Sequence, residues 1–140
     1  MAYYLRGLEP ALAAAQLTFS RGAFEAVLSN WSPEGLRRFG QHFAVDYVFL
    51  VAYGAFGWLL GRRLLAAGGR APARVLPWLL PAASAFDLLE NVLHQVFLAS
   101  RPSGSPEPLY FVAGTSALLK FALILAFIVL AIRAWRRKTA

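Results

Sequence analysis

The sequence predicts an all-α membrane protein, a four-helix transmembrane bundle with a short amphipathic helix at one membrane surface. Hydrophobic residues make up 59% of the 140 residues and charged residues only 15%, which leaves too few charges to cover a water-soluble protein of this size. Three apolar stretches are long enough to cross a bilayer: residues 43–61, 75–98 and 109–132. Basic residues gather after the first and the last of these stretches, a pattern typical of cytoplasmic segments.

The basic residues are distributed unevenly among the connecting segments. Residues 62–74 contain four arginines, residues 133–138 contain three arginines and one lysine, and neither segment contains an acidic residue. Residues 20–42 and 99–108 mix both signs of charge. This asymmetry predicts a multi-pass protein of the cell inner (plasma) membrane with a cytoplasmic C-terminus. The net charge of +7 is therefore a topology signal, and no nucleic-acid partner is expected.

Residues 3–20 are predicted as the first span, although only residues 11–19 are uncharged and largely apolar. That stretch covers about half a bilayer at the helical rise of ~1.5 Å per residue. A span here would place the N-terminus in the cytoplasm and would cover polar groups on the other three helices. Without it, the chain has three spans and an exported N-terminus.

Residues 21–31 place four apolar side chains on one helical face: Phe24, Val27, Leu28 and Trp31. This stripe predicts a short helix lying at the outer membrane surface. Ser32 is a suitable N-cap and Pro33 a suitable first residue for the next helix, so the helix of the second span is predicted to begin at about residue 33. Residues 101–108 contain three prolines and are predicted as an outer loop.

Three of the predicted spans carry ionisable side chains, which are costly at membrane depth and are seldom without a role there. The third span carries four polar groups on one arc of its helix: Asp87, Glu90, Asn91 and His94. The second span carries Asp46, with Tyr53 on the same face, and the fourth carries Lys120.

Residue counting places the four charged groups at similar depths. Asp87 and Lys120 each lie roughly 20 Å from the nearest cytoplasmic arginines at the helical rise. Asp46 and Glu90 lie about 24 Å from them. We therefore expect the three helices to share one polar site, slightly outside the membrane midplane.

Two interpretations of this site remain open. In the structural interpretation, Lys120 neutralises one carboxylate, and Asp87 is the expected partner because it matches the lysine in depth. Polar side chains nearby then satisfy the remaining groups and fix the helix register: Tyr53, Asn91 and Ser116. In the functional interpretation, three acids face one lysine, so a surplus carboxyl either stays protonated or binds a cationic or hydroxylated ligand.

The residue composition also limits which metal sites and catalytic nucleophiles the chain can form. The chain contains no cysteine, which excludes disulfides, thiolate metal sites and cysteine nucleophiles. Glu90 and His94 share a face near the two aspartates, but one histidine makes a Zn²⁺ or Fe²⁺ site a minor alternative. No metal and no cofactor are expected. Ser84 and Ser116 have no base at a meaningful spacing, so nucleophilic catalysis has no support.

Gly57 and Gly61 form a small-x-x-x-small motif in the second span. Such a motif lets another helix approach closely. We expect this packing to occur within the chain, and formation of a homo-oligomer is the alternative.

The run from Phe19 to Leu130 resembles a set of small bacterial membrane proteins with no assigned activity. In these proteins an outer segment ends in tryptophan and leads to a span with the pattern L-x-x-D-[YF]-x-F-x-x-x-Y. A later span carries the pattern D-x-x-E-N, and the last span has a lysine near its centre. The corresponding residues are Phe24–Trp31, Asp46-Tyr47-Val48-Phe49 with Tyr53, Asp87-Leu88-Leu89-Glu90-Asn91, and Lys120. The first span is shorter and more polar than in this pattern. The resemblance implies a four-helix membrane bundle.

Two classes of function follow from the sequence. The first is a non-catalytic membrane protein that binds a lipid or hydrophobic ligand, or is an accessory subunit of a larger membrane complex. The short loops favour it, because they leave no soluble catalytic domain. The second is a membrane-embedded enzyme or proton-coupled carrier that uses the charged groups of the spans: Asp46, Asp87, Glu90 and Lys120. The sequence does not decide whether the protein is an enzyme.

Overall fold

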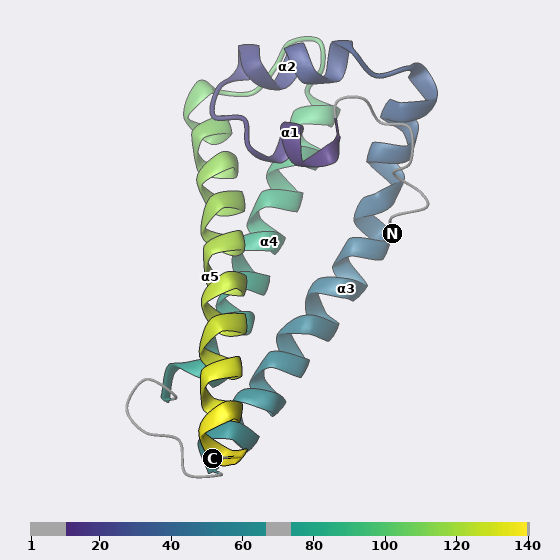
Figure 1. Ribbon diagram of the computed structural model, residues 1–140. Helices are drawn as coiled ribbons and strands as arrows, with labels where there is room; N and C mark the ends of the chain where they lie inside the picture. The colour runs from purple at the N-terminus through teal and green to yellow at the C-terminus, as the bar shows by residue number, and fades with distance from the viewer. Residues whose placement is uncertain (1–10, 67–73, 140) are drawn as a thin grey trace.

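The computed structural model describes residues 11–66 and 74–139, with side chains up to residue 136. Over these residues the chain forms helices and no strands, which confirms the predicted all-α class. The helices are α1 (Leu12–Gln16), α2 (Arg21–Ser29), α3 (Pro33–Ala66), α4 (Leu76–Ala99) and α5 (Glu107–Thr139). Figure 1 shows three long helices, α3, α4 and α5, with α1 and α2 together at one end. We call this end the α2 end and the opposite one the C-terminal end.

The helix α2 closes the α2 end of the bundle. Its N-cap is Ser20, whose hydroxyl oxygen accepts a hydrogen bond from the backbone N–H of Ala23 (3.3 Å), and this satisfies a donor of the first turn. The predicted apolar face is present, and Phe24 and Leu28 on it are fully buried. The Phe24 ring packs edge-on against Phe97 of α4 at 5.5 Å between centroids. This face therefore contacts the long helices rather than lying only on a membrane surface.

The described part of the predicted first span is not one continuous helix. The helix α1 is only five residues long, which is about 8 Å at the helical rise. The Thr18 hydroxyl then donates a hydrogen bond to the carbonyl of Ala15 (2.7 Å), and the backbone of Thr18 lies where a Cβ on Gly114 of α5 would be. Residues 11–20 therefore fold against α5 and do not form the second half of the span. Residues 3–10 lie outside the described residues.

The helix α3 begins as the sequence predicts. The Ser32 hydroxyl accepts a hydrogen bond from the backbone N–H of Gly35 (3.1 Å), and Pro33 is the first helical residue. At this position proline loses no hydrogen bond, because the first N–H groups of a helix have no partner within the helix. The predicted spans 43–61 and 109–132 fall in α3 and α5, and the span 75–98 falls in α4 apart from its first residue, Val75.

Glycines on α3 set its distance from α4. A Cβ on Gly57 would overlap the Leu80 side chain, and one on Gly61 would lie 2.5 Å from the backbone nitrogen of Pro77. Neither position tolerates a larger residue without moving the two helices apart. In the structure, the small-x-x-x-small motif therefore packs against α4 of the same chain.

The central helix is α4, which packs along both α3 and α5, whereas α3 and α5 contact each other little. Two apolar clusters fill the two ends of the bundle. The cluster at the α2 end includes Phe24, Phe39, Phe97 and Tyr110. The cluster at the C-terminal end consists of Leu64, Leu76, Leu80 and Phe127, with partly buried neighbours.

The outer surface of the long helices is apolar. Among the described helices, Pro33–Ala66 and Glu107–Arg136 are long and apolar enough to cross a membrane. Large hydrophobic side chains are exposed along both of them, including Val48, Val51, Phe56, Phe111 and Leu125. The charged and amide side chains in the middle of α4, those of Asp87, Glu90 and Asn91, are buried inside the bundle together with His94.

Candidate functional site

The polar side chains of α3, α4 and α5 meet between the two apolar clusters. We call this set the polar layer, and it consists of Asp46, Tyr53, Asp87, Glu90, Asn91 and Lys120. Its charged members and Asn91 are between 0% and 8% exposed, and Tyr53 is partly buried. Residue counting places the four charged members at similar depths, and the structure brings them together with Tyr53 and Asn91.

Lys120 of α5 bridges two carboxylates of α4. Its Nζ lies 2.9 Å from Oδ1 of Asp87, the predicted partner. It also lies 2.6 Å from Oε2 of Glu90. The two acids are three residues apart on a helix, so their side chains lie on one face and reach the same ammonium group. A lysine buried in this way is stabilised by its two partners.

Two hydrogen bonds connect α3 to the layer. The Asn91 side-chain amide donates to Oδ2 of Asp46 at 2.6 Å. The Tyr53 hydroxyl donates to Oδ2 of Asp87 at 3.1 Å. Asp87 thus accepts from α3 through one oxygen and from α5 through the other, and it joins all three long helices.

Three buried atoms of the layer have no hydrogen-bond partner within the described part of the chain: both carboxylate oxygens of Glu90 and Oδ1 of Asn91. Of these, Oε2 of Glu90 forms the ion pair with Lys120, which leaves Glu90 Oε1 and Asn91 Oδ1 without either kind of partner. Both side chains are fully buried. Nδ1 of His94 lies 3.8 Å from Glu90 Oε1, which is too long for a hydrogen bond. Such atoms are unusual, because a buried polar group without a partner costs roughly 1–3 kcal/mol.

The layer also carries an excess of acidic groups. Three carboxyl groups, those of Asp46, Asp87 and Glu90, face one ammonium group, that of Lys120. Lys120 contacts two of the acids, and Asp46 is held by a neutral amide. The layer can therefore accept a proton, a cation, or hydrogen bonds from a hydroxyl or ammonium group.

His94 belongs to the aromatic cluster rather than to the centre of the layer. Its ring stacks on Phe24 at 5.4 Å with an interplanar angle of 7°, and it meets Phe97 edge-on at 5.9 Å. His42 has similar surroundings, stacked on Phe39 and close to Phe43. Sequence reasoning places His94 on the polar arc of α4 but gives no sign of its stacking on Phe24, because that ring comes from α2.

Ser116 does not satisfy the carboxylates, in contrast to the prediction. Its hydroxyl donates to the carbonyl of Val112 one turn earlier in α5 (2.8 Å), which is the common bond of a serine inside a helix. Ser84 of α4 instead donates to the carbonyl of Leu50 in α3 (2.9 Å). Both serines thus bind backbone groups.

A further polar contact between α3 and α4 lies beside the layer. The Gln95 amide donates to the Tyr47 hydroxyl at 2.5 Å. Sequence reasoning missed this pair, although Gln95 is on the polar arc of α4 and Tyr47 follows Asp46.

The described residues contain no group of three or more His, Cys, Asp or Glu side chains arranged to hold a metal ion. Comparison with protein-family models, with curated proteins and with solved structures finds no match. The resemblance to small bacterial membrane proteins stays a prediction, and the function has to be argued from the geometry.

Proposed function

We propose that this chain is an integral membrane protein whose polar layer binds the hydroxyl or ammonium group of a lipid-soluble ligand. The proposal has two parts, insertion of the long helices into a membrane and binding of a ligand inside the bundle. Each part rests on a different set of observations.

Membrane insertion is supported by what the long helices expose. Only 28% of the apolar window of α3 and 22% of that of α5 is buried, whereas the core helix of a soluble protein is mostly buried. With α4 packed between them, three crossings fit the described residues better than the predicted four. The arginines at residues 62–74 and after residue 132 then lie on the cytoplasmic side of the inner membrane, and α1 and α2 lie outside.

Ligand binding is supported chiefly by the two buried atoms that have no partner, Glu90 Oε1 and Asn91 Oδ1. Both atoms are hydrogen-bond acceptors when the acid is ionised. A ligand that donates hydrogen bonds to them would therefore offset the free-energy cost of burying them without a partner. The partly buried Tyr53 marks the side from which such a ligand would reach the layer. An apolar body is expected, because the ligand has to dissolve in the bilayer to arrive there.

Native mass spectrometry of the purified protein tests this proposal. We expect the wild type to retain a lipid-soluble compound and Glu90→Gln to retain at least tenfold less of it, because a hydrogen bond to a charged group contributes about 1.5–3 kcal/mol. Glu25→Gln is the matched control, since this acid lies on α2 and pairs with Arg101 at 3.0 Å. Thermal unfolding confirms that the variants are folded. Wild-type protein without any bound compound, or equal retention by Glu90→Gln, would contradict the proposal.

A proton-coupled carrier or a membrane-embedded enzyme is the second candidate. One observation favours it, the row of ionisable groups that runs from His94 past Glu90 and Lys120 to Asp87 and Tyr53. Such rows are found along proton paths in membrane proteins. Turnover of a lipid extract, or proton uptake by reconstituted vesicles, would favour this candidate. Co-purification of a stoichiometric protein would favour an accessory subunit instead.

A further inference from the structure

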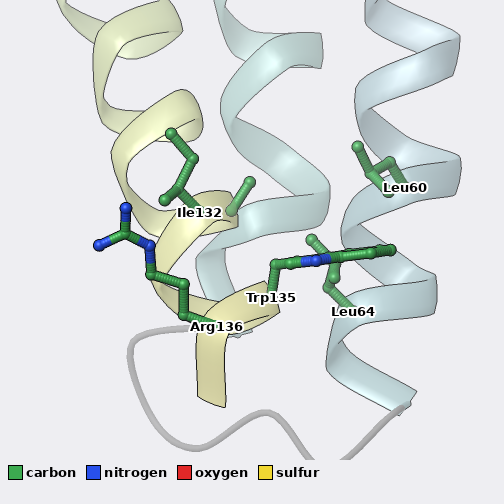
Figure 2. Close-up of a pocket in the computed structure, with 6 residues that line it drawn as sticks. Leu60, Leu64, Ile132, Trp135 and Arg136 are labelled. Atoms are coloured by element: carbon green, nitrogen blue, oxygen red, sulfur yellow. The ribbon is translucent and has the colours of Figure 1, made fainter. Parts of the chain in front are cut away.

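A second feature of the molecule, separate from the polar layer, is an apolar groove between α3 and α5 at the C-terminal end. It has a volume of about 320 Å³ and is lined by Leu60, Leu64, Ala131, Ile132, Trp135 and Arg136. Figure 2 shows the Trp135 indole extending from α5 toward α3, close to Leu64, with Ile132 one turn away on α5. The volume lies at the low end of the range for ligand pockets in proteins.

The charges around this groove are of one sign. The arginines at this end whose side chains are described are Arg62, Arg63, Arg74, Arg133 and Arg136. Acidic residues are absent from α3 after Asp46, from α4 before Asp87, and from α5 after Glu107. The groove therefore has an apolar interior and a basic rim, in which Arg136 lines the groove and Arg63 and Arg133 adjoin the lining residues Leu64 and Ile132 in sequence.

At the α2 end, arginines form ion pairs with glutamates. There Glu34 pairs with Arg37 at 2.7 Å and with Arg38 at 2.8 Å, and Glu25 pairs with Arg101 at 3.0 Å. Most of the positive charge at the α2 end is thus offset by acids of the same chain. At the C-terminal end an excess of positive charge surrounds an apolar groove, which complements a molecule with an anionic head and an apolar tail.

We infer that the groove between α3 and α5 binds an anionic phospholipid. Its acyl chain lies along Leu60, Leu64 and Ile132, and its phosphate lies beside the arginines of the rim. Basic pockets between helices at the cytoplasmic membrane surface bind anionic lipid headgroups in this way, and a tryptophan such as Trp135 is favoured at that level. The inference rests on membrane insertion and does not depend on a ligand in the polar layer.

Native mass spectrometry with two lipids tests this inference. The purified full-length protein is mixed with phosphatidylglycerol or with phosphatidylcholine of the same acyl chains, and the bound lipid is counted. We expect phosphatidylglycerol to be retained in preference. Retention should fall about fivefold in Arg136→Gln, the effect of one arginine near an anionic surface, and should also fall in Ile132→Asn, which changes an exposed side chain of the groove.

A control variant distinguishes the groove from the α2 end. Arg37→Gln removes an exposed arginine from the α2 end. It should retain phosphatidylglycerol as the wild type does, and inorganic phosphate should not displace the lipid. Equal retention of both lipids, or unchanged retention in both groove variants, would overturn the inference. A dimer that dissociates in Ile132→Asn with lipid retention unchanged would also overturn it and would assign the groove to a second copy of the chain.

Discussion

The polar layer and the outer surface of the same helices lie at the same height of the bundle, and their polarity is reversed relative to a soluble protein. Glu90 inside is 0% exposed, whereas Val48, which faces outward between Asp46 and Tyr53 of α3, is 71% exposed. In water-soluble proteins the charged side chain is the one at the surface. This reversed polarity is what the proposed membrane insertion requires, because a bilayer is less polar than the centre of the bundle.

The comparison also tells which interactions hold the helices together. In the proposed lipid environment apolar side chains gain little by leaving lipid, so packing and polar contacts would carry more of the association between helices. Here the contacts are those of Lys120, Tyr53 and Asn91, together with the close approach at Gly57 and Gly61. Changes inside the bundle should therefore be far more destabilising than changes on its outer surface.

The largest effect is expected for Lys120→Leu. This change leaves two buried carboxylates without their cation, and breaking a buried ion pair by removing one partner costs about 3–5 kcal/mol. Unfolding by SDS in mixed micelles, followed by circular dichroism, measures the loss. Asp87→Asn in the same chain should recover part of the stability, and adding Glu90→Gln should recover more, because Lys120 contacts both acids. A loss below ~1 kcal/mol in Lys120→Leu would mean that the ion pairs do not exist in the membrane.

A smaller effect is expected for Tyr53→Phe. The change removes one hydrogen bond to Asp87 and keeps the ring, so the free energy of unfolding should fall by about 1–2 kcal/mol. The same unfolding measurement gives the value. In an Asp87→Asn background the loss should be smaller, because Tyr53 and Asp87 act on the same bond. An equal loss in both backgrounds would show that the tyrosine acts through packing alone.

Much of the polar layer is predictable from sequence because a helix is regular. Because each residue of a helix adds a fixed rise, the number of residues between a side chain and the flanking arginines gives its depth in the membrane. Because each residue also adds a fixed rotation, the spacing between two residues tells whether they lie on the same face of the helix. These two rules bring Asp46, Asp87, Glu90 and Lys120 together without knowledge of the fold. The start of α3 is predictable for a similar reason, since Ser32 and Pro33 act locally.

Other features depend on contacts between distant segments. The predicted span at 3–20 fails over residues 11–20 because Thr18 packs against Gly114, almost a hundred residues away. The second partner of Lys120 and the surroundings of His94 depend on side chains from neighbouring helices. The groove beside Trp135 depends on how two helices diverge, which periodicity does not reveal.

Labelling of single cysteines tests the central claim, that the exposed apolar surface lies in lipid, most directly. The chain has no cysteine of its own, so each variant reports one position. Val48→Cys lies on the outer surface beside the polar layer, Ser103→Cys in the exposed loop before α5, and Ala66→Cys at the exposed end of α3. The reagent is a charged maleimide that does not cross membranes.

In intact cells we expect the reagent to label Ser103→Cys, and to label Ala66→Cys only after the membrane is opened. Val48→Cys should stay unlabelled in both conditions and react only after denaturation in SDS, although its side chain is among the most exposed of the folded chain. Labelling of Val48→Cys in intact membranes as fast as Ser103→Cys would contradict the account, because water would then reach the surface that we assign to lipid.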